Sequence, residues 1–291
     1  MNYYNLYNDA RKKIDETIDV MRTLSVIIPV YNTSAYIMRC LQSVEAQTLH
    51  DFEVILVDDH GQDDSISVAT GFAAKSKRKD IHYVFTQTPI NSGPAVARNL
   101  GMQQAKGEYI AFLDADDWIE PEMYDALYTN AKSCAADLSC CNMIQDFEDR
   151  RPNKVLKNPV IGNGLITVAG KKYFLTTFVS YFTTFAYRRE WLIENQIQFA
   201  NSKSSEDSSF LACCILAAER MAQTDQSFYH YIIHSGSLTQ RKVWKGREKR
   251  RAFAALFAFA RSRGLMSTYW LQLFYVYAKK AILVPVVEMI K

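Results

Sequence analysis

The chain has 291 residues, which is enough to bury a substantial core as one domain with additions or as two small domains. Hydrophobic residues make up 48% of the sequence, and glycine and proline are scarce, so a disordered or fibrous protein is excluded. The net charge of +3 argues against a dedicated nucleic-acid binder, although seven Lys or Arg residues are concentrated between Arg241 and Arg251.

The six cysteines show no Cys-x-x-Cys spacing of a zinc site or a redox motif, so we expect buried thiols. Residues 1–23 are polar and amphipathic, lack the pattern of a signal peptide, and predict an N-terminal helical extension. The longest apolar stretches are short and are separated by Lys279 and Lys280, so none is expected to span a bilayer. The sequence therefore predicts a protein of the reducing cytoplasm.

Strand and helix signals alternate along the first half of the chain at the spacing of βαβ units. This alternation predicts a mostly parallel, doubly wound sheet with right-handed crossovers. Ligands of such sheets bind beyond the carboxyl ends of the strands, where Tyr31, residues 58–59 and residues 114–117 fall. The predicted strands are 24–30, 53–57, 81–85 and 109–113, and the predicted helices are one with Ile37, Cys40, Leu41 and Val44 on its apolar face, 64–76, 93–105 and one starting at Pro121.

The alternation is lost after Asp137. Residues 146–165 are polar and rich in Pro, Asn and Gly, and we expect a loop there. From about residue 247 the pattern is helical, with Phe253, Leu256, Phe257 and Ala260 on one face. Helices are predicted at 169–180, 189–196 and 207–221, and a strand at 226–233. The chain thus divides into the extension 1–23, a main unit 24–240 and a basic, amphipathic helical tail 241–291.

Three carboxylates, those of Asp114, Asp116 and Asp117, directly follow the predicted strand 109–113. If the strand continues, Asp114 and Asp116 share one face and repel each other unless a cation lies between them. Oxygen ligands of this kind suit Mg²⁺ or Mn²⁺, which usually also bind phosphate oxygens. The alternative is an acidic turn that caps the following helix, with Asp117 as the N-cap.

Further candidates each have a structural alternative. Asp59 ends a predicted strand, where it can accept hydrogen bonds from a base or a ribose, whereas helix capping explains the nearby Asp63 or Asp64. Arg98 lies one turn inside a helix and either neutralises a diphosphate or forms a structural bridge to an aspartate. Considered without its neighbours, Asp207 is best interpreted as an acidic residue in the first turn of a helix, and His234 as a solvated loop residue.

Four stretches together resemble the family 2 inverting glycosyltransferases, which have the A-type glycosyltransferase fold: 24–32, 57–59, 93–101 and 107–118. The resemblance implies that 24–145 is the nucleotide-sugar-binding half and 146–240 the acceptor half of a catalytic domain. Two positions depart from the family pattern: His60 replaces a common Gly, and Ile232 replaces a common Arg.

The resemblance also implies roles for individual residues. Pro29, Tyr31 and Asp59 would line the nucleoside pocket, and Asn91 and Arg98 would contribute to the donor site. Asp114-Ala115-Asp116 would be the Asp-x-Asp motif that contacts ribose and the divalent metal. Asp207, in the Glu206-Asp207 pair, would be the catalytic base, and His234 would lie near the metal or the diphosphate.

The implied activity is transfer of a sugar from a nucleotide-diphosphate sugar, with a UDP-sugar expected, to an acceptor hydroxyl with inversion, assisted by Mn²⁺ or Mg²⁺. The implied acceptor is a glycan or lipid-linked glycan of bacterial cell-surface polysaccharide synthesis. Residues 241–291 would then contact the inner face of the membrane, or else pack on the catalytic domain or a second subunit. The alternatives are a sugar-1-phosphate nucleotidyltransferase, for which a Gly-rich loop after the first strand is missing, and an inactive nucleotide-sugar-binding partner subunit. The oligomeric state is left open.

Overall fold

The computed structural model describes residues 22–149, 151–177, 181–234 and 246–280. Their strands form one mixed sheet in the order β3-β2-β1-β4-β9-β6-β10-β5, with β7 paired to β6 and β8 paired to β10. The first four strands of this order are parallel, as the alternating pattern predicts. The strands are β1 (Arg22–Val30), β2 (Phe52–Asp58), β3 (Ile81–Gln87), β4 (Gly107–Phe112), β5 (Trp118–Ile119), β6 (Leu138–Phe147), β7 (Lys154–Leu156), β8 (Gly164–Leu165), β9 (Phe185–Arg188) and β10 (Arg220–Ile233).

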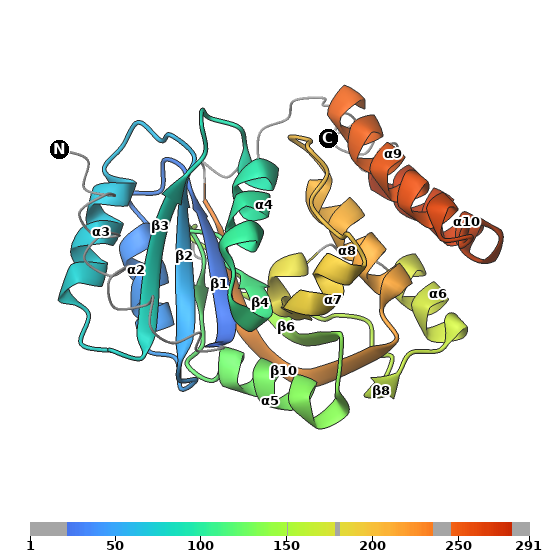
Figure 1. Ribbon diagram of the computed structural model, residues 1–291, viewed down its shortest axis with the longest axis horizontal. Helices are drawn as coiled ribbons and strands as arrows, with labels where there is room; N and C mark the ends of the chain where they lie inside the picture. The colour runs from blue at the N-terminus through green and yellow to red at the C-terminus, as the bar shows by residue number, and fades with distance from the viewer. Residues whose placement is uncertain (1–21, 150, 178–180, 235–245, 281–291) are drawn as a thin grey trace.

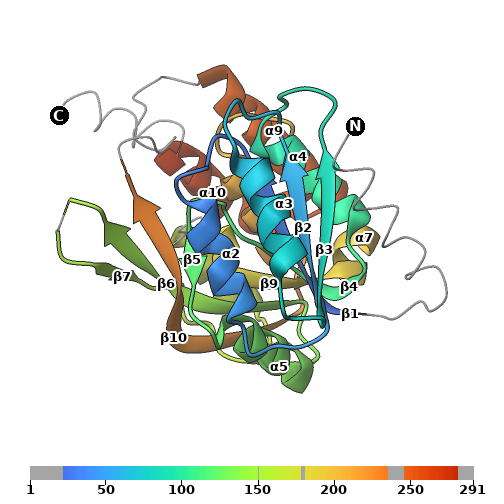
Figure 2. The ribbon, with the colours of Figure 1, turned by 90° about the vertical axis from the view of Figure 1, so that its left-hand side faces the viewer.

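Helices cover both faces of the parallel part of the sheet, with α2 and α3 on one side and α4 on the other (Figures 1 and 2). The helices α9 and α10 lie at the far end of the molecule, beside α8 and α6 (Figure 1). The helices are α2 (Ile37–Glu45), α3 (Ser65–Lys75), α4 (Pro94–Gln104), α5 (Met123–Cys134), α6 (Val168–Thr176), α7 (Arg189–Glu194), α8 (Glu206–Ala217), α9 (Gly246–Ser262) and α10 (Met266–Ala278), and η1 (Phe182–Thr184) is a 3-10 turn.

Strand β1 shows why its sequence is a continuous apolar run. Successive side chains of a strand point to opposite faces, and here both faces are buried. Ile27 packs in the core layer with α4 and α8, whereas Val26 and Ile28 pack in the layer with α2, α3 and α5. Gly107 brings β4 close to β1, since a Cβ there would lie only 2.4 Å from the backbone nitrogen of Ser25.

The second half contains strands that the sequence did not reveal. Polar side chains interrupt the apolar pattern of β6. One of them, Asn142, is buried, and hydrogen bonds compensate for its burial: its amide donates to the carbonyl of Asp225 (2.9 Å) and accepts from the backbone N–H of Asn158 (3.0 Å). β9 was also missed, and short strands β7 and β8 lie within the expected loop 146–165. The expected helix 207–221 ends at Ala217, and β10 begins at Arg220 rather than residue 226.

The apolar face of α9 is covered by the rest of the protein. Phe253, Leu256 and Ala260 are buried in the core layer that contains α8, and Phe257 is partly buried against it. Membrane docking through this face is therefore wrong, because the face packs on the rest of the chain, as in the alternative. Among the described residues no helix combines the length and apolarity needed to cross a bilayer. Residues 1–21 of the expected extension, and residues 241–245 and 281–291 of the expected tail, lie outside the described residues.

Candidate active site

The acidic cluster forms a turn and not a continuation of the strand. β4 ends at Phe112, and the backbone N–H of Asp117 donates to the carbonyl of Asp114 (3.0 Å), which closes the turn. The strand geometry predicted for Asp114 and Asp116 is thus wrong, because the chain must turn to enter β5. The two carboxylates are still neighbours: burial, and next the negative charge of Asp114, raise the pKa of Asp116.

Asp117 ties this turn to β10. It is 1% exposed, and its carboxylate accepts hydrogen bonds from the hydroxyl of Tyr229 (2.6 Å) and the backbone N–H of Ile232 (2.8 Å). The alternative in which Asp117 caps the next helix is wrong, because Glu122 occupies the N-cap of α5. Burial, and next the charges of Asp116 and Asp114, raise the pKa of Asp117 well above its usual value, and the hydrogen bonds from Tyr229 and Ile232 oppose this rise.

Arg98 connects the acidic turn to the start of α8. One guanidinium nitrogen lies 2.8 Å from Oδ1 of Asp114, and the other lies 3.5 Å from Oε1 of Glu206. The guanidinium also lies over the rings of Phe182 and Phe199, at 4.6 and 5.4 Å from their centroids, and the residue is 6% exposed. Of the two roles considered for Arg98, the bridge to an aspartate is confirmed, whereas contact with a diphosphate stays a prediction.

Glu206 and Asp207 begin α8 after a left-handed residue, Ser205, whose φ is 63°. Burial, and next the charge of Asp207, raise the pKa of Glu206 to about 7, although Arg98 opposes this rise. Asp207 is only partly buried, and its Oδ1 accepts a hydrogen bond from the backbone N–H of Ser208 (2.6 Å). The pair therefore combines a buried carboxyl group of raised pKa with one that is partly exposed.

Residues of the tail contact the segment just before α8, and the sequence did not predict these contacts. Glu248 in α9 accepts a hydrogen bond from the backbone N–H of Lys203 (2.9 Å), and its carbonyl accepts one from the hydroxyl of Ser202 (2.9 Å). Lys280 follows α10, and its pKa is lowered by burial, against the opposing charge of Asp207. Both Glu248 and Lys280 lie in a part of the sequence that carries no recognisable site motif.

His234 reaches the acidic turn from the end of β10. Its Nε2 lies 3.1 Å from Oδ2 of Asp116, and the ring of Tyr36 packs against its imidazole at a centroid distance of 4.5 Å. The 3.1 Å distance between His234 and Asp116 is that of an ordinary hydrogen bond, and it also leaves both side chains close enough that they could hold one divalent ion. Asp114, the third predicted ligand, is engaged by Arg98.

No group of three or more His, Cys, Asp or Glu side chains within the described ranges is arranged to hold a metal ion by itself. A divalent ion at Asp116 and His234 would need further oxygen ligands. Mg²⁺ is usually bound in this way, through one or two carboxylates together with substrate phosphates and water. The residues present therefore fit an ion that binds together with a diphosphate, and the assignment of Asp114, Asp116 and His234 stays a prediction.

Asp59 is buried beneath the loop that joins β3 to α4. Its carboxylate accepts hydrogen bonds from the hydroxyl of Thr88 and from the backbone N–H groups of Ser92 and Gly93, each at 2.8 Å. The observed contacts thus hold the loop that carries Asn91, which is exposed. Contact of Asp59 with a nucleotide base stays a prediction.

The remaining predicted residues lie around the ends of β1 and β4. Pro29 is partly buried near the end of β1, Tyr31 follows the strand and is 45% exposed, and Ala115 is buried inside the acidic turn. His60 takes the place of a common Gly with a φ of 57°, a conformation that Gly adopts without strain. Its ring contacts the carbonyl of Thr88, so this departure also supports the loop above Asp59.

Comparison with known proteins places the chain in a family. The model of glycosyl transferase family 2 matches residues 25–195. The chain belongs to this family. A similar family member is the uncharacterized glycosyltransferase EpsJ of Bacillus subtilis, which is 33% identical over 227 residues, 75% of this chain and 63% of that protein. The poly(ribitol-phosphate) beta-glucosyltransferase of Bacillus spizizenii is 29% identical and covers 72% of this chain, which matches 32% of that enzyme. The chain thus spans less than two thirds of these relatives.

Solved structures show the same fold. S. aureus TarS 1–349 in complex with UDP-GlcNAc superposes with a TM-score of 0.68 and 24% identity, covering 81% of this chain and 66% of that one. The mannosyltransferase PcManGT of Pyrobaculum calidifontis, in complex with GDP-Man and Mn²⁺, has a TM-score of 0.55, 17% identity and coverage of 99% and 86%. The fold is therefore the A-type glycosyltransferase fold, as expected from the sequence.

Proposed function

We propose that the protein transfers a sugar from a nucleotide-diphosphate sugar to an acceptor hydroxyl with inversion at the anomeric carbon. The observation that carries this proposal is the bridge formed by Arg98 between Asp114 and Glu206. It joins the acidic turn, where the donor diphosphate would bind, to the helix start that bears Asp207. A donor-binding module alone would have no need of the second carboxylate pair.

Single displacement requires a group that takes the proton of the attacking hydroxyl, because a sugar hydroxyl is a poor nucleophile. In this proposal Asp207 takes that proton. Its accessible position at the start of α8 suits an incoming acceptor. Arg98 holds Asp114 in place, and Asp117 ties the acidic turn to β10. These contacts keep Asp116 next to His234, where the donor diphosphate would bind.

A divalent cation held by Asp116 and His234 would neutralise charge on the leaving diphosphate when bound. Support for this comes from the 3.1 Å separation of the two side chains and from the Mn²⁺ in the PcManGT complex. We propose a UDP-sugar as donor, which is what TarS binds in its complex with UDP-GlcNAc. A bacterial cell-surface glycan or its lipid-linked precursor is the proposed acceptor.

The donor is tested by incubating the protein with Mn²⁺ and UDP-, GDP- and dTDP-sugars in turn, and following nucleotide release. One donor is expected to be hydrolysed, and proton NMR of the released sugar is expected to show the inverted anomer first. Formation of a sugar 1-phosphate and a nucleoside triphosphate when pyrophosphate is added would instead indicate a nucleotidyltransferase. Absence of hydrolysis with tight donor binding would indicate an inactive binding subunit.

We also propose cytoplasmic location with peripheral membrane contact, now through the outer face of α10. Trp270 and Phe274 are 55% and 56% exposed on this helix, and aromatic side chains of this kind suit a membrane interface. Co-sedimentation with anionic vesicles should decrease in a Trp270→Ala, Phe274→Ala variant. Equal sedimentation of parent and variant would exclude this contact.

A further inference from the structure

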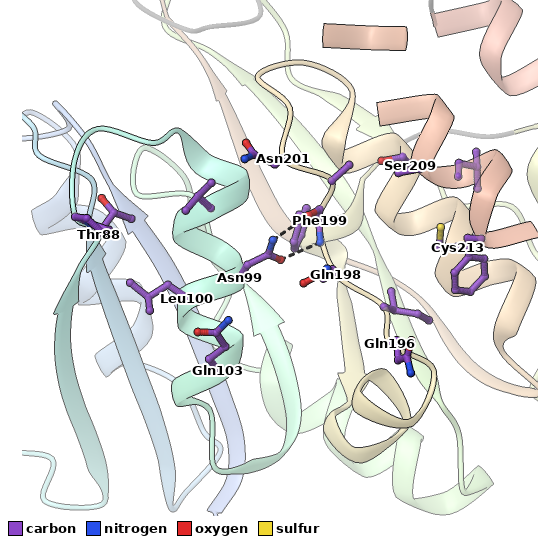
Figure 3. A pocket seen from close by; sticks show the side chains of 17 residues that line it. Thr88, Asn99, Leu100, Gln103, Gln196, Gln198, Phe199, Asn201, Ser209 and Cys213 are labelled. Atoms are coloured by element: carbon purple, nitrogen blue, oxygen red, sulfur yellow. Dashed lines mark hydrogen bonds between the residues drawn. The ribbon is translucent and has the colours of Figure 1, made fainter. Parts of the chain in front are cut away.

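A groove of about 520 Å³ lies between α4, the segment 196–201, and helices α8 and α9 (Figure 3). It borders the proposed reaction centre, formed by the acidic turn, Arg98 and the start of α8, but includes none of the charged residues of that centre. The 17 described residues that line it carry no Asp, Glu, Lys, Arg or His. The Cys213 thiol in its wall stays neutral as well, because burial raises its pKa to about 12.

Side-chain amides are the main polar groups of the groove. Gln103 extends from α4 on one side, and Gln196, Gln198 and Asn201 come from the opposite segment (Figure 3). All four are exposed, and within the described part of the chain their side-chain amides have no hydrogen-bond partner. Each amide offers one acceptor oxygen and two N–H donors, which matches the paired hydroxyls of a sugar ring.

Apart from Thr88, Asn99 and Ser209, the rest of the lining is apolar. Leu100 from α4 and Leu256 and Phe259 from α9 line it, and they can cover the C–H faces of a sugar. None of the lining residues offers a charge to a phosphate or a carboxylate, although Arg251 and Arg263 donate to the carbonyls of Asn201 and Asn195 beside the groove. The volume lies within the range of small-molecule sites, at about 300–1,000 Å³.

The groove shares its walls with the reaction centre. The amide of Asn99 donates to the carbonyl of Phe199 and accepts from its N–H, both at 2.9 Å, and the Phe199 ring packs on Arg98. Thr88, at the edge of the groove, donates to Asp59. Because Asn99 is engaged by the backbone of Phe199, it forms part of the wall and is not a ligand group.

We propose that this groove is an accessory binding site for a neutral oligosaccharide, separate from the donor and the catalytic base. The four exposed amides, the apolar floor and the lack of charge among the lining residues favour this ligand class over a nucleotide or an anionic glycan. Binding in the groove requires no transfer reaction, so groove binding and donor hydrolysis can fail separately.

The test measures binding of N,N′,N″-triacetylchitotriose, maltotriose, galactotriose and trigalacturonate to the full chain, one at a time, by saturation-transfer NMR. At least one of the three neutral trisaccharides is expected to bind, and trigalacturonate is not. Gln103→Ala with Gln198→Ala should weaken binding about tenfold through lost hydrogen bonds, and Ala255→Trp should block the groove. Gln104→Ala is the matched control, because Gln104 is an exposed neighbour that does not line the groove.

Thermal melting checks that each variant is folded, and nucleotide binding checks that the donor site is intact. Binding that is weakened in the double glutamine variant, blocked in Ala255→Trp and kept in the Gln104→Ala control supports the proposal. It is overturned if no neutral trisaccharide binds the parent, if trigalacturonate binds equally well, or if folded Ala255→Trp binds as the parent does.

Discussion

Replacement of Arg98 by Met tests the bridge at the centre of the proposed site. Met has a similar length and is apolar, so it keeps much of the packing on Phe182 and Phe199 but leaves Asp114 and Glu206 without their counter-charge. Breaking a buried ion pair by removing one partner costs about 3–5 kcal/mol. We expect a loss of this size at pH 8, although the partial exposure of Asp114 places it toward the lower end.

The loss should be smaller at pH 6. The pKa of Glu206 is already raised from 4.5 to about 7, and it must rise further when Arg98 no longer stabilises the charged form. A carboxyl group whose pKa is raised in the folded state stabilises the protein at low pH, and this stabilisation is lost as the pH rises through the folded-state value. Each tenfold change in the protonation equilibrium corresponds to about 1.4 kcal/mol, so the variant should recover about 1–2 kcal/mol between pH 8 and pH 6 relative to the parent.

Urea unfolding at pH 6 and pH 8 measures both effects. Arg151→Met is the matched control, because Arg151 pairs with Asp149 at the exposed surface, where an ion pair contributes little to stability. A loss for Arg98→Met no larger than that of the control would show that the bridge does not stabilise the fold. A loss that does not depend on pH would show that Glu206 does not titrate as described.

Two further predictions concern the donor and the tail. In the parent, adding Mn²⁺ should raise the affinity for a nucleoside diphosphate, and Asp116→Ala should abolish this gain, as measured by calorimetry. A variant that still responds to Mn²⁺ and to EDTA like the parent would exclude Asp116 as a ligand. Glu248→Ala should lower the transfer rate about tenfold with little change in donor affinity, because it removes the acceptor for the Lys203 N–H and lets the start of α8 shift. The control is Glu194→Ala at an exposed position, which should have the parental rate.

The sequence predicted the parallel part of the sheet because β1, β2 and β4 are buried on both faces and read as apolar runs, whereas β3, at the edge, alternates buried and partly exposed residues. It failed at β6, where Ser139 and Asn142 are buried and the partner of Asn142 lies far away in the chain. It placed Arg98 near the acidic cluster, but the bridge to Glu206 joins residues 108 positions apart and could not be read from local pattern. The contacts of Glu248 and Lys280 were missed for the same reason.

The tail shows how a correct pattern can lead to a wrong partner. The periodicity of Phe253, Leu256 and Ala260 correctly predicted an amphipathic helix. Amphipathicity does not say what covers the apolar face, and here α8 and its neighbours cover it instead of lipid. The turn at Asp114–Asp117 is a similar case, because the apolar run predicted the strand but not where it ends.

The central claim, that Asp207 is the base of a transfer reaction, is tested most directly by Asp207→Asn. This change keeps the size of the side chain and removes its ability to take a proton. We expect that transfer falls at least about 100-fold while donor affinity stays as in the parent, and that the exposed Asp125→Asn control is fully active. A folded Asp207→Asn protein that keeps more than about a tenth of the parental rate would contradict the claim.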